Sequence, residues 1–339
     1  MSERIATTPG VYPLPEWTKD DLADKKGHQK HDLLDGSEGE EIESIYDEAR
    51  AEVIDTQQSA GLDRIVEGQL RWDDILAHPL TIHEHVDTGS LRRYYDNNNF
   101  YREPIVTDEL DFNGDLADDL EAAAELTDDL QAVVPGPYSL FDLATDEHYG
   151  DADAFLGAIG EYVAGEVEAF PDAVETLFIL DPSLATTPPS DEDGLDERAA
   201  HAIDAVVDAA GTDVETVLYP YWGSLTEKVH AHVLDTDIDA LGYDFVTERA
   251  DNLYNINEYG TTDDIALGLI DSQNTLVESA DTIEERIDWF LDQTAPTIDF
   301  ERLYVTPNAE LFYLPISTFE EKLTTLQTAV DQTTEVTAQ

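Results

Sequence analysis

The order of secondary structure along the chain limits the possible fold more than any other feature. Short runs rich in β-branched and aromatic residues alternate with longer runs in which apolar residues recur every three or four positions. Strands that alternate with helices form parallel sheets, and about eight repeats are typical of a (β/α)8 barrel of the TIM type. The predicted strands are Thr7–Tyr12, Arg64–Gln69, Leu130–Gly136, Leu177–Asp181, Thr216–Trp222, Tyr243–Glu248, Ile265–Asp271 and Leu303–Asn308.

The helical pattern is clearest in Glu40–Gln58, where the apolar residues lie on one face of a helix. Further helices are predicted at Ala152–Phe170, Leu195–Ala210, Ser279–Gln293 and Phe319–Val330. No linker is long enough to divide the chain, so we expect residues 1–339 to form a single barrel.

One segment interrupts the alternation. After the second predicted strand, Arg92–Val106 combines aromatic residues with asparagines and is too long for a simple connection. We expect an excursion beside the mouth of the barrel, where such folds carry their chemistry. The alternative is a surface hairpin without a function.

The charge of the chain describes its surface. There are 77 Asp and Glu residues against 17 Lys and Arg, a formal net charge of -60 that is spread over the whole length. Such a surface repels itself in dilute buffer, whereas at molar salt the Debye length falls to about 3 Å and screens the repulsion. Disorder is the alternative, but 41% of the residues are apolar and fall in periodic blocks. We therefore expect a cytoplasmic protein of an extreme halophile, a cell that keeps molar salt inside.

Composition excludes several classes of function. No apolar run approaches the ~18–20 residues of a membrane span, and the first residues lack the apolar core of a signal peptide. The chain has no cysteine, which rules out disulfides and thiolate metal sites. An acidic surface repels nucleic acid and anionic lipid, so we expect neither as a partner.

Residues at the carboxyl ends of the predicted strands are the first candidates for a site, because barrel enzymes place their chemistry there. They are carboxamides, carboxylates and phenols, which suit a polar ligand but include no obvious nucleophile: Gln69, Asp181, Tyr219, Tyr221, Glu248, Asp271 and Asn308.

Two clusters of basic and histidine residues have simpler explanations. His83 and His85 could share a metal, but no carboxylate accompanies them at a diagnostic spacing, and loop histidines explain them better. Four lysines form a cluster that could attract an anionic substrate, although local ion pairs with the neighbouring aspartates are the commoner arrangement. These lysines are Lys19, Lys25, Lys26 and Lys30.

Eight motifs in order resemble the cobalamin-independent methionine synthase family over nearly the whole chain. They are GVYPLPEW (10–17), VEGQLRWDD (66–74), RYYDNNNFYREP (93–104), VPGPYSL (134–140), FILDPSLA (178–185), YPYWG (219–223), LGLIDSQN (267–274) and LYVTPNAEL (303–311). The resemblance implies a relative of a two-barrel enzyme. Its C-terminal barrel holds a zinc ion that activates homocysteine, and its N-terminal barrel has lost the zinc and helps to bind methyltetrahydrofolate.

The chain departs from the zinc barrel at the ligand positions that the resemblance defines. Tyr219-Pro220-Tyr221 stands for histidine-x-cysteine, and Pro307-Asn308-Ala309 stands for Pro-Asp-Cys. Glu248 could match the glutamate ligand, but one carboxylate cannot hold zinc alone. On the amino-acid side, Gly68-Gln69 replaces Gly-Glu and Leu180-Asp181-Pro182 replaces Asp-Glu-Pro. We therefore expect no metal and no cofactor bound by this chain.

The excursion is similar to a Trp-Phe-x-Thr-Asn-Tyr-His-Tyr segment of the zinc-free N-terminal barrel. The resemblance then implies a stand-alone, donor-binding half that is inactive alone. Its partner would be a zinc-bearing paralogous barrel that holds homocysteine, and the lysine cluster would meet the glutamate tail of a folate-type methyl donor. The residues proposed for substrate or donor binding are Gln69, Arg71, Trp72, Asp73, Asn97, Asn98, Asn99, Tyr101, Arg102, Asp181, Tyr219, Tyr221, Glu248 and Asn308.

Two other functions remain open at this point. The barrel could have kept the scaffold and become a regulatory or structural partner without turnover. It could also be a complete methyltransferase with a new site, but this would require an activating base or metal, and the sequence offers neither.

The excess of carboxylates predicts a dependence on salt. Lowering KCl from molar to about 0.1 M raises the Debye length to ~10 Å, and the unscreened repulsion should unfold or loosen the chain. Thermal denaturation followed by circular dichroism at both salt concentrations checks this. A melting temperature that does not change over this range would contradict the prediction.

Overall fold

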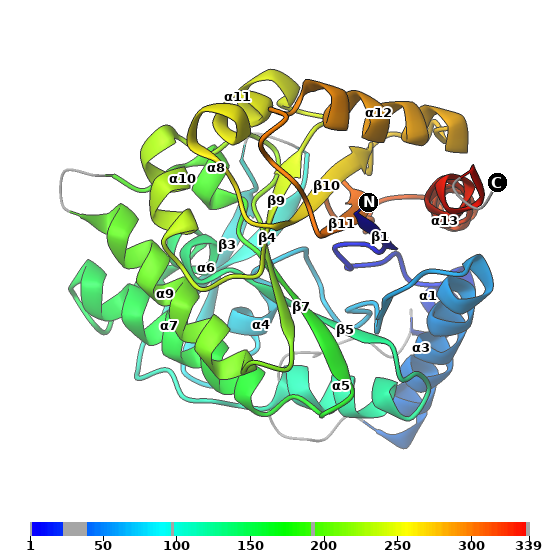
Figure 1. Ribbon diagram of the computed structural model, residues 1–339. Helices are drawn as coiled ribbons and strands as arrows, with labels where there is room; N and C mark the ends of the chain where they lie inside the picture. Colours follow the sequence, from blue (N-terminus) through cyan, green and yellow to red (C-terminus); the bar gives the residue numbers. More distant parts are fainter. Residues whose placement is uncertain (1, 23–38, 96–97, 191–193, 337–339) are drawn as a thin grey trace.

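Eight parallel strands in sequential order form the centre of the molecule (Figure 1). The computed structural model describes residues 2–22, 39–95, 98–190 and 194–336. The sheet order is β1-β11-β10-β9-β8-β7-β5-β2, which is the cyclic order of a (β/α)8 barrel. The strands are β1 (Glu3–Ala6), β2 (Ile65–Val66), β5 (Leu130–Pro135), β7 (Val174–Leu180), β8 (Glu215–Tyr219), β9 (Ala240–Asp244), β10 (Asp264–Ile270) and β11 (Arg302–Pro307).

The seam between the first and second strands is closed by single backbone contacts rather than by a ladder. Asp63 N–H donates to the carbonyl of Ala6 at 3.1 Å, and Tyr12 N–H donates to the carbonyl of Gly68 at 2.9 Å. The two edges of the sheet therefore meet, and the predicted barrel class is confirmed.

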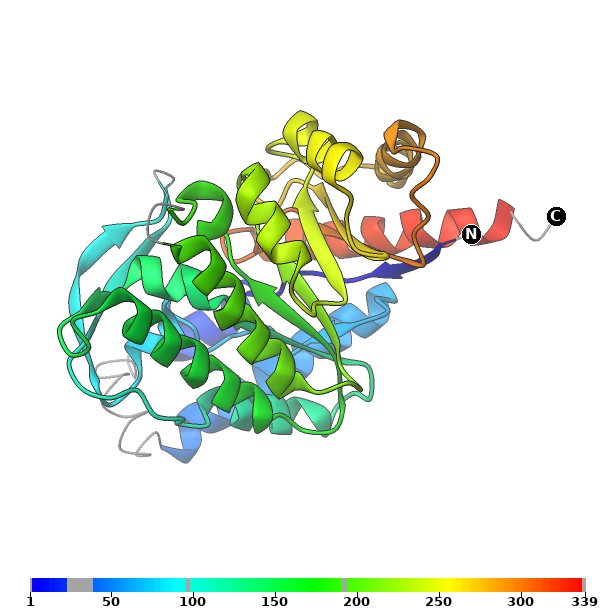
Figure 2. The same cartoon turned by 60° about the vertical axis from the view of Figure 1, so that its left-hand side comes forward.

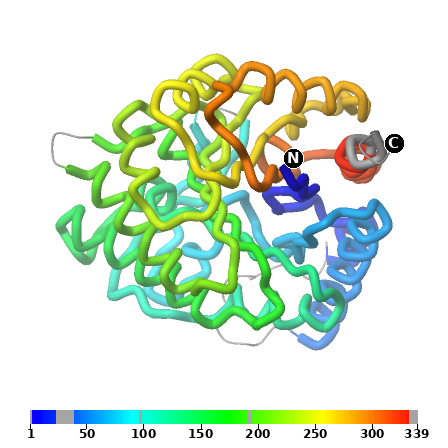
Figure 3. The backbone as a smooth tube through the Cα atoms, viewed as in Figure 1, coloured from blue at the N-terminus to red at the C-terminus, as the bar shows by residue number. Residues whose placement is uncertain are grey.

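Helices surround the strands on the outside, as the tube in Figure 3 shows. These helices differ in length, and the longer ones are amphipathic and turn their apolar faces toward the sheet. The helices are α1 (Glu16–Leu22), α3 (Glu40–Ala60), α4 (His78–Thr81), α5 (Asp115–Ala124), α6 (Pro137–Leu143), α7 (Ala152–Glu168), α8 (Ser183–Thr186), α9 (Leu195–Ala210), α10 (Glu227–Leu234), α11 (Arg249–Tyr259), α12 (Ala280–Gln293) and α13 (Ile316–Val336). Each of the five predicted helices is present.

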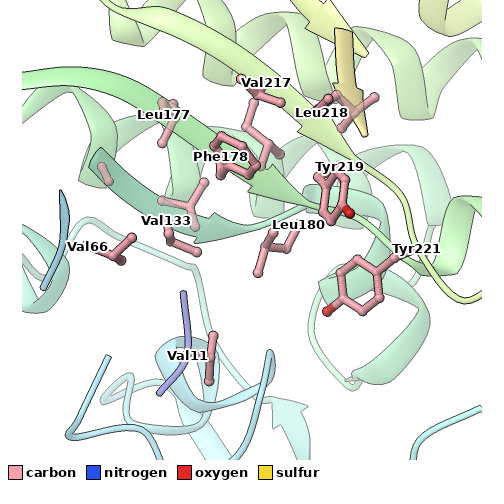
Figure 4. Close-up of a cluster of buried hydrophobic side chains, with 14 of the residues drawn as sticks. Val11, Val66, Val133, Leu177, Phe178, Leu180, Val217, Leu218, Tyr219 and Tyr221 are labelled. Carbon is pink, nitrogen blue, oxygen red and sulfur yellow. The ribbon is translucent and has the colours of Figure 1, made fainter. Parts of the chain in front are cut away.

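Aromatic and aliphatic side chains pack together in the core beside the strands (Figure 4). Phe178 on β7 lies 5.8 Å from the ring of Tyr219 on β8 and 6.1 Å from that of Tyr304 on β11. Tyr219 reaches across two neighbouring strands, because a Cβ atom at Gly242 on β9 or at Gly268 on β10 would overlap its side chain. Glycine at these two strand positions therefore makes room for one tyrosine.

Two strand boundaries differ from the sequence prediction for identifiable reasons. Thr7–Tyr12 is not a strand, because Pro9 lacks an N–H and Gly10 and Val11 have φ of 74° and 54°, which a ladder cannot accommodate. The strand predicted at Tyr243–Glu248 ends at Asp244, whose carboxylate accepts hydrogen bonds from the following backbone and turns the chain.

The excursion is an antiparallel hairpin of β3 (Val86–Arg93) and β4 (Phe100–Val106), and β6 (Thr145–Asp146) extends it to a second sheet. In Figure 2 the hairpin lies at one side of the molecule and the end of α13 at the other. The outer face of the hairpin is exposed, whereas its tip turns Tyr94, Asn99 and Tyr101 inward.

Some of the few cations of the chain lie inside the fold. The side chain of Arg50 is only 5% exposed and pairs with Asp119, and Lys322 is 1% exposed and contacts Glu278 at 2.7 Å. In the described part of the chain, no helix is long and apolar enough to cross a membrane.

A buried carboxylate fixes the start of α5. Glu166 on α7 accepts hydrogen bonds from the backbone N–H groups of Asn113, Gly114 and Leu116 at 3.1, 2.8 and 3.2 Å. The N–H groups of Gly114 and Leu116 belong to the start of α5, where N–H groups have no partner within their own helix, and Asn113 directly precedes it. The side chain thus acts as a helix cap supplied from another helix.

Glu166→Ala should therefore destabilise the protein by about 2–3 kcal/mol, because three charge-assisted hydrogen bonds to backbone N–H groups are lost. Urea denaturation in molar KCl measures the change. Glu168→Ala, an exposed position on the same helix, should shift the free energy of unfolding by less than about 0.5 kcal/mol. Equal losses for the two variants would contradict the capping role.

Candidate functional site

The end of β8 brings two tyrosines and a tryptophan to the mouth of the barrel. Tyr219 and Tyr221 are fully buried, and Figure 4 shows their hydroxyl groups pointing in different directions. Tyr219 donates to the carbonyl of Pro307 on β11 at 2.8 Å. Tyr221 Oη has no hydrogen-bond partner, and Nε1 of the adjacent Trp222 has none either. Trp222 has a φ of 62°, a strained conformation of the kind that clusters at functional sites.

A carboxylate at the end of β9 organises the neighbouring loops. Asp244 accepts hydrogen bonds from the backbone of Trp222, Val246 and Thr247 and from Asn308 Nδ2 at 3.1 Å. Asn308 in turn accepts from Ser272 N–H at 3.0 Å. Asp244 and Asn308 are therefore fully engaged in holding the loops after β8, β9 and β10.

Glu310 lies two residues beyond Asn308. Of the acids in the mouth, its carboxyl group has the fewest hydrogen-bond partners. Its side chain is 2% exposed, its Oε1 accepts a 3.4 Å hydrogen bond from Asn99 Nδ2, and its Oε2 has no partner. Burial raises the pKa of Glu310 to about 8, partly opposed by the nearby Tyr221 hydroxyl. At neutral pH the acid is thus mostly protonated.

Asp181 directly follows β7 and is held by the first turn of α6. It accepts from Ser139 Oγ at 2.6 Å and from the backbone N–H groups of Ser139 and Tyr138. Burial raises the pKa of Asp181 to about 7, although these hydrogen bonds favour its charged form. Gly136 passes so close to this carboxylate that a Cβ atom there would overlap it.

The loop after β2 serves mainly to position the segment that follows β1. Gln69 is 2% exposed, and its Oε1 accepts from Val11 N–H at 2.7 Å. Glu67 Oε1 accepts from the N–H of Gln69, and burial raises the pKa of Glu67 to about 7. The carboxamide of Gln69 is thus engaged with the protein backbone.

The hairpin is tied to the rim of the mouth at several points. Tyr94 donates to Asp74 at 2.6 Å, and the hydroxyls of Tyr95 and Ser183 lie 2.7 Å apart. The ring of Tyr95 also packs edge-on against Trp222 at 5.4 Å. Together with the bond from Asn99 to Glu310, these contacts place the hairpin beside the site.

The structure thus brings together some of the predicted site residues and separates others. Asn99, Asp181, Tyr219, Tyr221 and Asn308 lie around the mouth, with Tyr101 packed on Tyr94 at 4.5 Å. Of the others, Gln69 accepts from Val11 N–H. Arg71 stacks over Tyr46, Trp72 is buried against His78, and Asp73, Asn98, Arg102, Glu248 and Lys19 are exposed. Asn97, Lys25, Lys26 and Lys30 lie outside the described residues.

Sequence reasoning missed four residues of the site: Asp74, Trp222, Asp244 and Glu310. Glu310 and Trp222 stand three residues beyond β11 and β8, inside motifs that were recognised. Their positions after the strands could have been used to find them from the sequence. Their burial and their lack of hydrogen-bond partners are visible only in the structure. His83 and His85 each bond a backbone carbonyl through one ring nitrogen, so these rings are held by the loop that precedes α5.

The side chains at the positions of the zinc ligands do not fit zinc. Tyr219 is engaged with Pro307, burial holds the pKa of Tyr221 well above its usual value, and Ala309 offers no ligand. Asp244 is saturated by N–H donors. Over the described residues, no group of three or more His, Asp or Glu could hold a metal ion.

Comparison with known proteins identifies the family. A family model described as "Cobalamin-independent synthase, Catalytic domain" matches residues 5–334. The chain belongs to the cobalamin-independent methionine synthase family. The family predicted from the sequence is therefore confirmed.

Curated relatives and solved structures agree with this assignment. The chain is 23% identical to a methionine synthase of Sulfolobus acidocaldarius, over 95% of this chain and 91% of that protein, and 20% identical to one of Saccharolobus solfataricus, over 94% and 92%. A B12-independent methionine synthase from a Shewanella species, solved with selenomethionine, has a TM-score of 0.78 at 17% identity and 99% coverage of both chains. A methyltransferase from Methanosarcina mazei has a TM-score of 0.60 at 12% identity, over 98% of this chain and 94% of that one.

The two tyrosines of β8 should respond differently to loss of the hydroxyl. Tyr219→Phe leaves a buried carbonyl unpaired and should destabilise by about 1–2 kcal/mol. Tyr221→Phe breaks no hydrogen bond and should leave stability unchanged or raise it slightly. Urea denaturation of both variants in the same molar KCl is the test, and a larger loss for Tyr221→Phe would contradict the assignment.

Proposed function

We propose that this chain takes part in methyl transfer from a methyltetrahydrofolate-type donor to homocysteine, as a zinc-free, donor-binding half of the reaction. In this proposal a separate, zinc-bearing paralogous barrel holds homocysteine. The relatives named methionine synthase support the reaction class, and the residues of the mouth support the division of labour.

One observation carries the proposal: the ligand positions are filled while the mouth stays polar. Tyr219, Asn308 and Asp244 are engaged in hydrogen bonds within the protein. Tyr221 and Glu310 nevertheless keep buried polar atoms without partners. A barrel that had become purely structural would gain stability by losing such atoms, so their presence favours a retained binding function.

The chemistry of the reaction explains why a second chain is needed. A thiol such as that of homocysteine attacks as the thiolate, and a zinc ion lowers the thiol pKa and holds the anion. This chain has no cysteine and no suitable ligand set in its described residues. Binding and orienting a donor requires only hydrogen bonds and aromatic surfaces, which the mouth supplies.

The experiment must distinguish a whole enzyme from a donor-binding half. The matched family model describes the catalytic domain, and the relatives named methionine synthase are similar in length to this chain. A chain of this size can therefore be a whole enzyme where the ligands are present. The similarity of the hairpin to the zinc-free N-terminal barrel remains the argument for the donor-binding half.

The purified chain in molar KCl should carry no stoichiometric zinc and should form no methionine from homocysteine and methyltetrahydrofolate. Addition of the zinc-bearing paralogue from the same cell should restore turnover and bring both chains into one peak on a sizing column. Elemental analysis, product assay and chromatography measure the three outcomes.

The control is the paralogue alone. If the paralogue is equally active without this chain, only a regulatory or structural role remains. If this chain turns over alone, the zinc-free division of labour is wrong and the mouth contains a different catalytic site.

A further inference from the structure

We propose that the mouth recognises a small organic cation, with the side chain of Glu310 as its counter-ion. The ligand has a positively charged nitrogen or sulfur centre next to an acceptor oxygen. This inference rests on the proposed function, because it names the substrate class of the same site.

Three buried polar atoms without partners carry the proposal. They are Tyr221 Oη, Trp222 Nε1 and Glu310 Oε2, and they come from the loops after β8 and β11. The rings of Tyr221 and Trp222 lie 4.8 Å apart, and the carboxyl of Glu310 is close enough to Tyr221 to affect the pKa of its hydroxyl. Native proteins seldom leave several such atoms unpaired in one place unless a ligand or an ion satisfies them.

The charged groups around the mouth indicate the sign of the ligand's charge. Asp181, Asp244 and Glu310 lie around the mouth, and within the described parts of the chain no Lys, Arg or His forms an ion pair with any of them. Asp181 and Asp244 are compensated by backbone N–H donors. Glu310 has only the long bond from Asn99 and the nearby hydroxyl of Tyr221, so it is the acid with the least compensation. A cation at Oε2 would compensate the ionised form of Glu310, which burial otherwise disfavours.

Aromatic rings add to this preference. Trp222 contacts both Tyr221 and Tyr95, with ring centroids 4.8 and 5.4 Å apart and near edge-to-face angles. The faces of such rings attract cations, and tryptophan does so best. Carboxylate and aromatic rings together are the combination that recognises alkylated ammonium groups.

The remaining two atoms describe the other end of the ligand. Trp222 Nε1–H can only donate, and the hydroxyl of Tyr221 can donate, so both fit an acceptor oxygen. A donor that carries its methyl group on an amine nitrogen has a good leaving group only when that nitrogen is positively charged. A site for a methyl donor and a site for a cation are therefore compatible.

The protonation of Glu310 gives a second, independent readout. Its neighbours are Tyr221, Tyr313 and Asn99, none of them cationic, and burial raises its pKa to about 8. A cation binds the ionised form, so binding releases a proton below that pH. Affinity should rise between about pH 6.5 and about pH 8.5 and then level off.

Two matched pairs of probes test the sign of the charge by calorimetry in molar KCl. Trimethylglycine is compared with 3,3-dimethylbutanoate, which has the same shape without the positive centre, and glycine is compared with propionate. We expect at least one cationic probe to bind about tenfold or more tightly than its uncharged-head partner. Discrimination within the first pair indicates that the site binds an alkylated onium group. Discrimination within the second pair indicates that it binds a protonated amine. Equal affinity within both pairs, or no binding by any probe, would overturn the proposal.

Glu310→Gln keeps the shape of the side chain and removes its charge. It should therefore abolish the difference in affinity within the probe pair that the parent protein discriminates, and also the dependence of affinity on pH. Glu84→Gln makes the same change at an exposed glutamate and should preserve both. Tyr221→Phe breaks no internal hydrogen bond and should weaken binding without loss of stability. Unchanged discrimination in Glu310→Gln would show that another group binds the cation.

The outcomes separate this inference from the proposed function. If the chain restores turnover with the paralogue but Glu310→Gln binds the probes as the parent does, only the cation site is wrong. If Glu310 is needed to discriminate the probes but this chain does not increase methionine formation by the paralogue, the cation site is supported and the methyl-transfer role is wrong.

Discussion

Buried carboxylates at the ends of the strands organise this barrel, and they do so without cations. Asp244 collects the loops after β8, β9 and β10 by accepting their backbone N–H groups and the carboxamide of Asn308. Asp181 does the same for the first turn of α6, which follows β5. Because these charges are compensated by N–H donors that the loops would otherwise have to satisfy elsewhere, the mouth can be acidic and still ordered. Glu310 has no such set of donors, and this difference distinguishes a ligand site from a structural one.

The arrangement of the chain's cations follows from the same chemistry. Arg50 and Lys322 are buried in ion pairs. Their charges are therefore paired inside the fold and do little to offset the acidic surface. The surface then depends on ions from the solvent for screening. We expect solvent cations to act on the outside of the protein, whereas backbone donors act at the mouth.

The sequence predicted the barrel because strand and helix periods alternate clearly, and helix Leu195–Ala210 has the predicted limits. It placed the first strand wrongly, since Thr7–Tyr12 has strand composition and only the observed backbone shows that Gly10 and Val11 turn. In the site, Tyr221 and Asn308 were predictable from their positions after strands. Glu310 was not, because its importance lies in burial and in a missing partner, and neither is visible in a residue type. Glu248 has the right chemistry but lies on the exposed start of α11.

Tyr219 has a consequence for the history of the family. Its side chain occupies the space above Gly242 and Gly268, so none of the three positions can change freely while the other two remain. A smaller residue at position 219 would leave a cavity beside two glycines, and a side chain at either glycine would collide with the tyrosine. The three positions should therefore covary among related sequences. Members that carry a histidine ligand at the place of Tyr219 should be free to have larger residues at the other two positions.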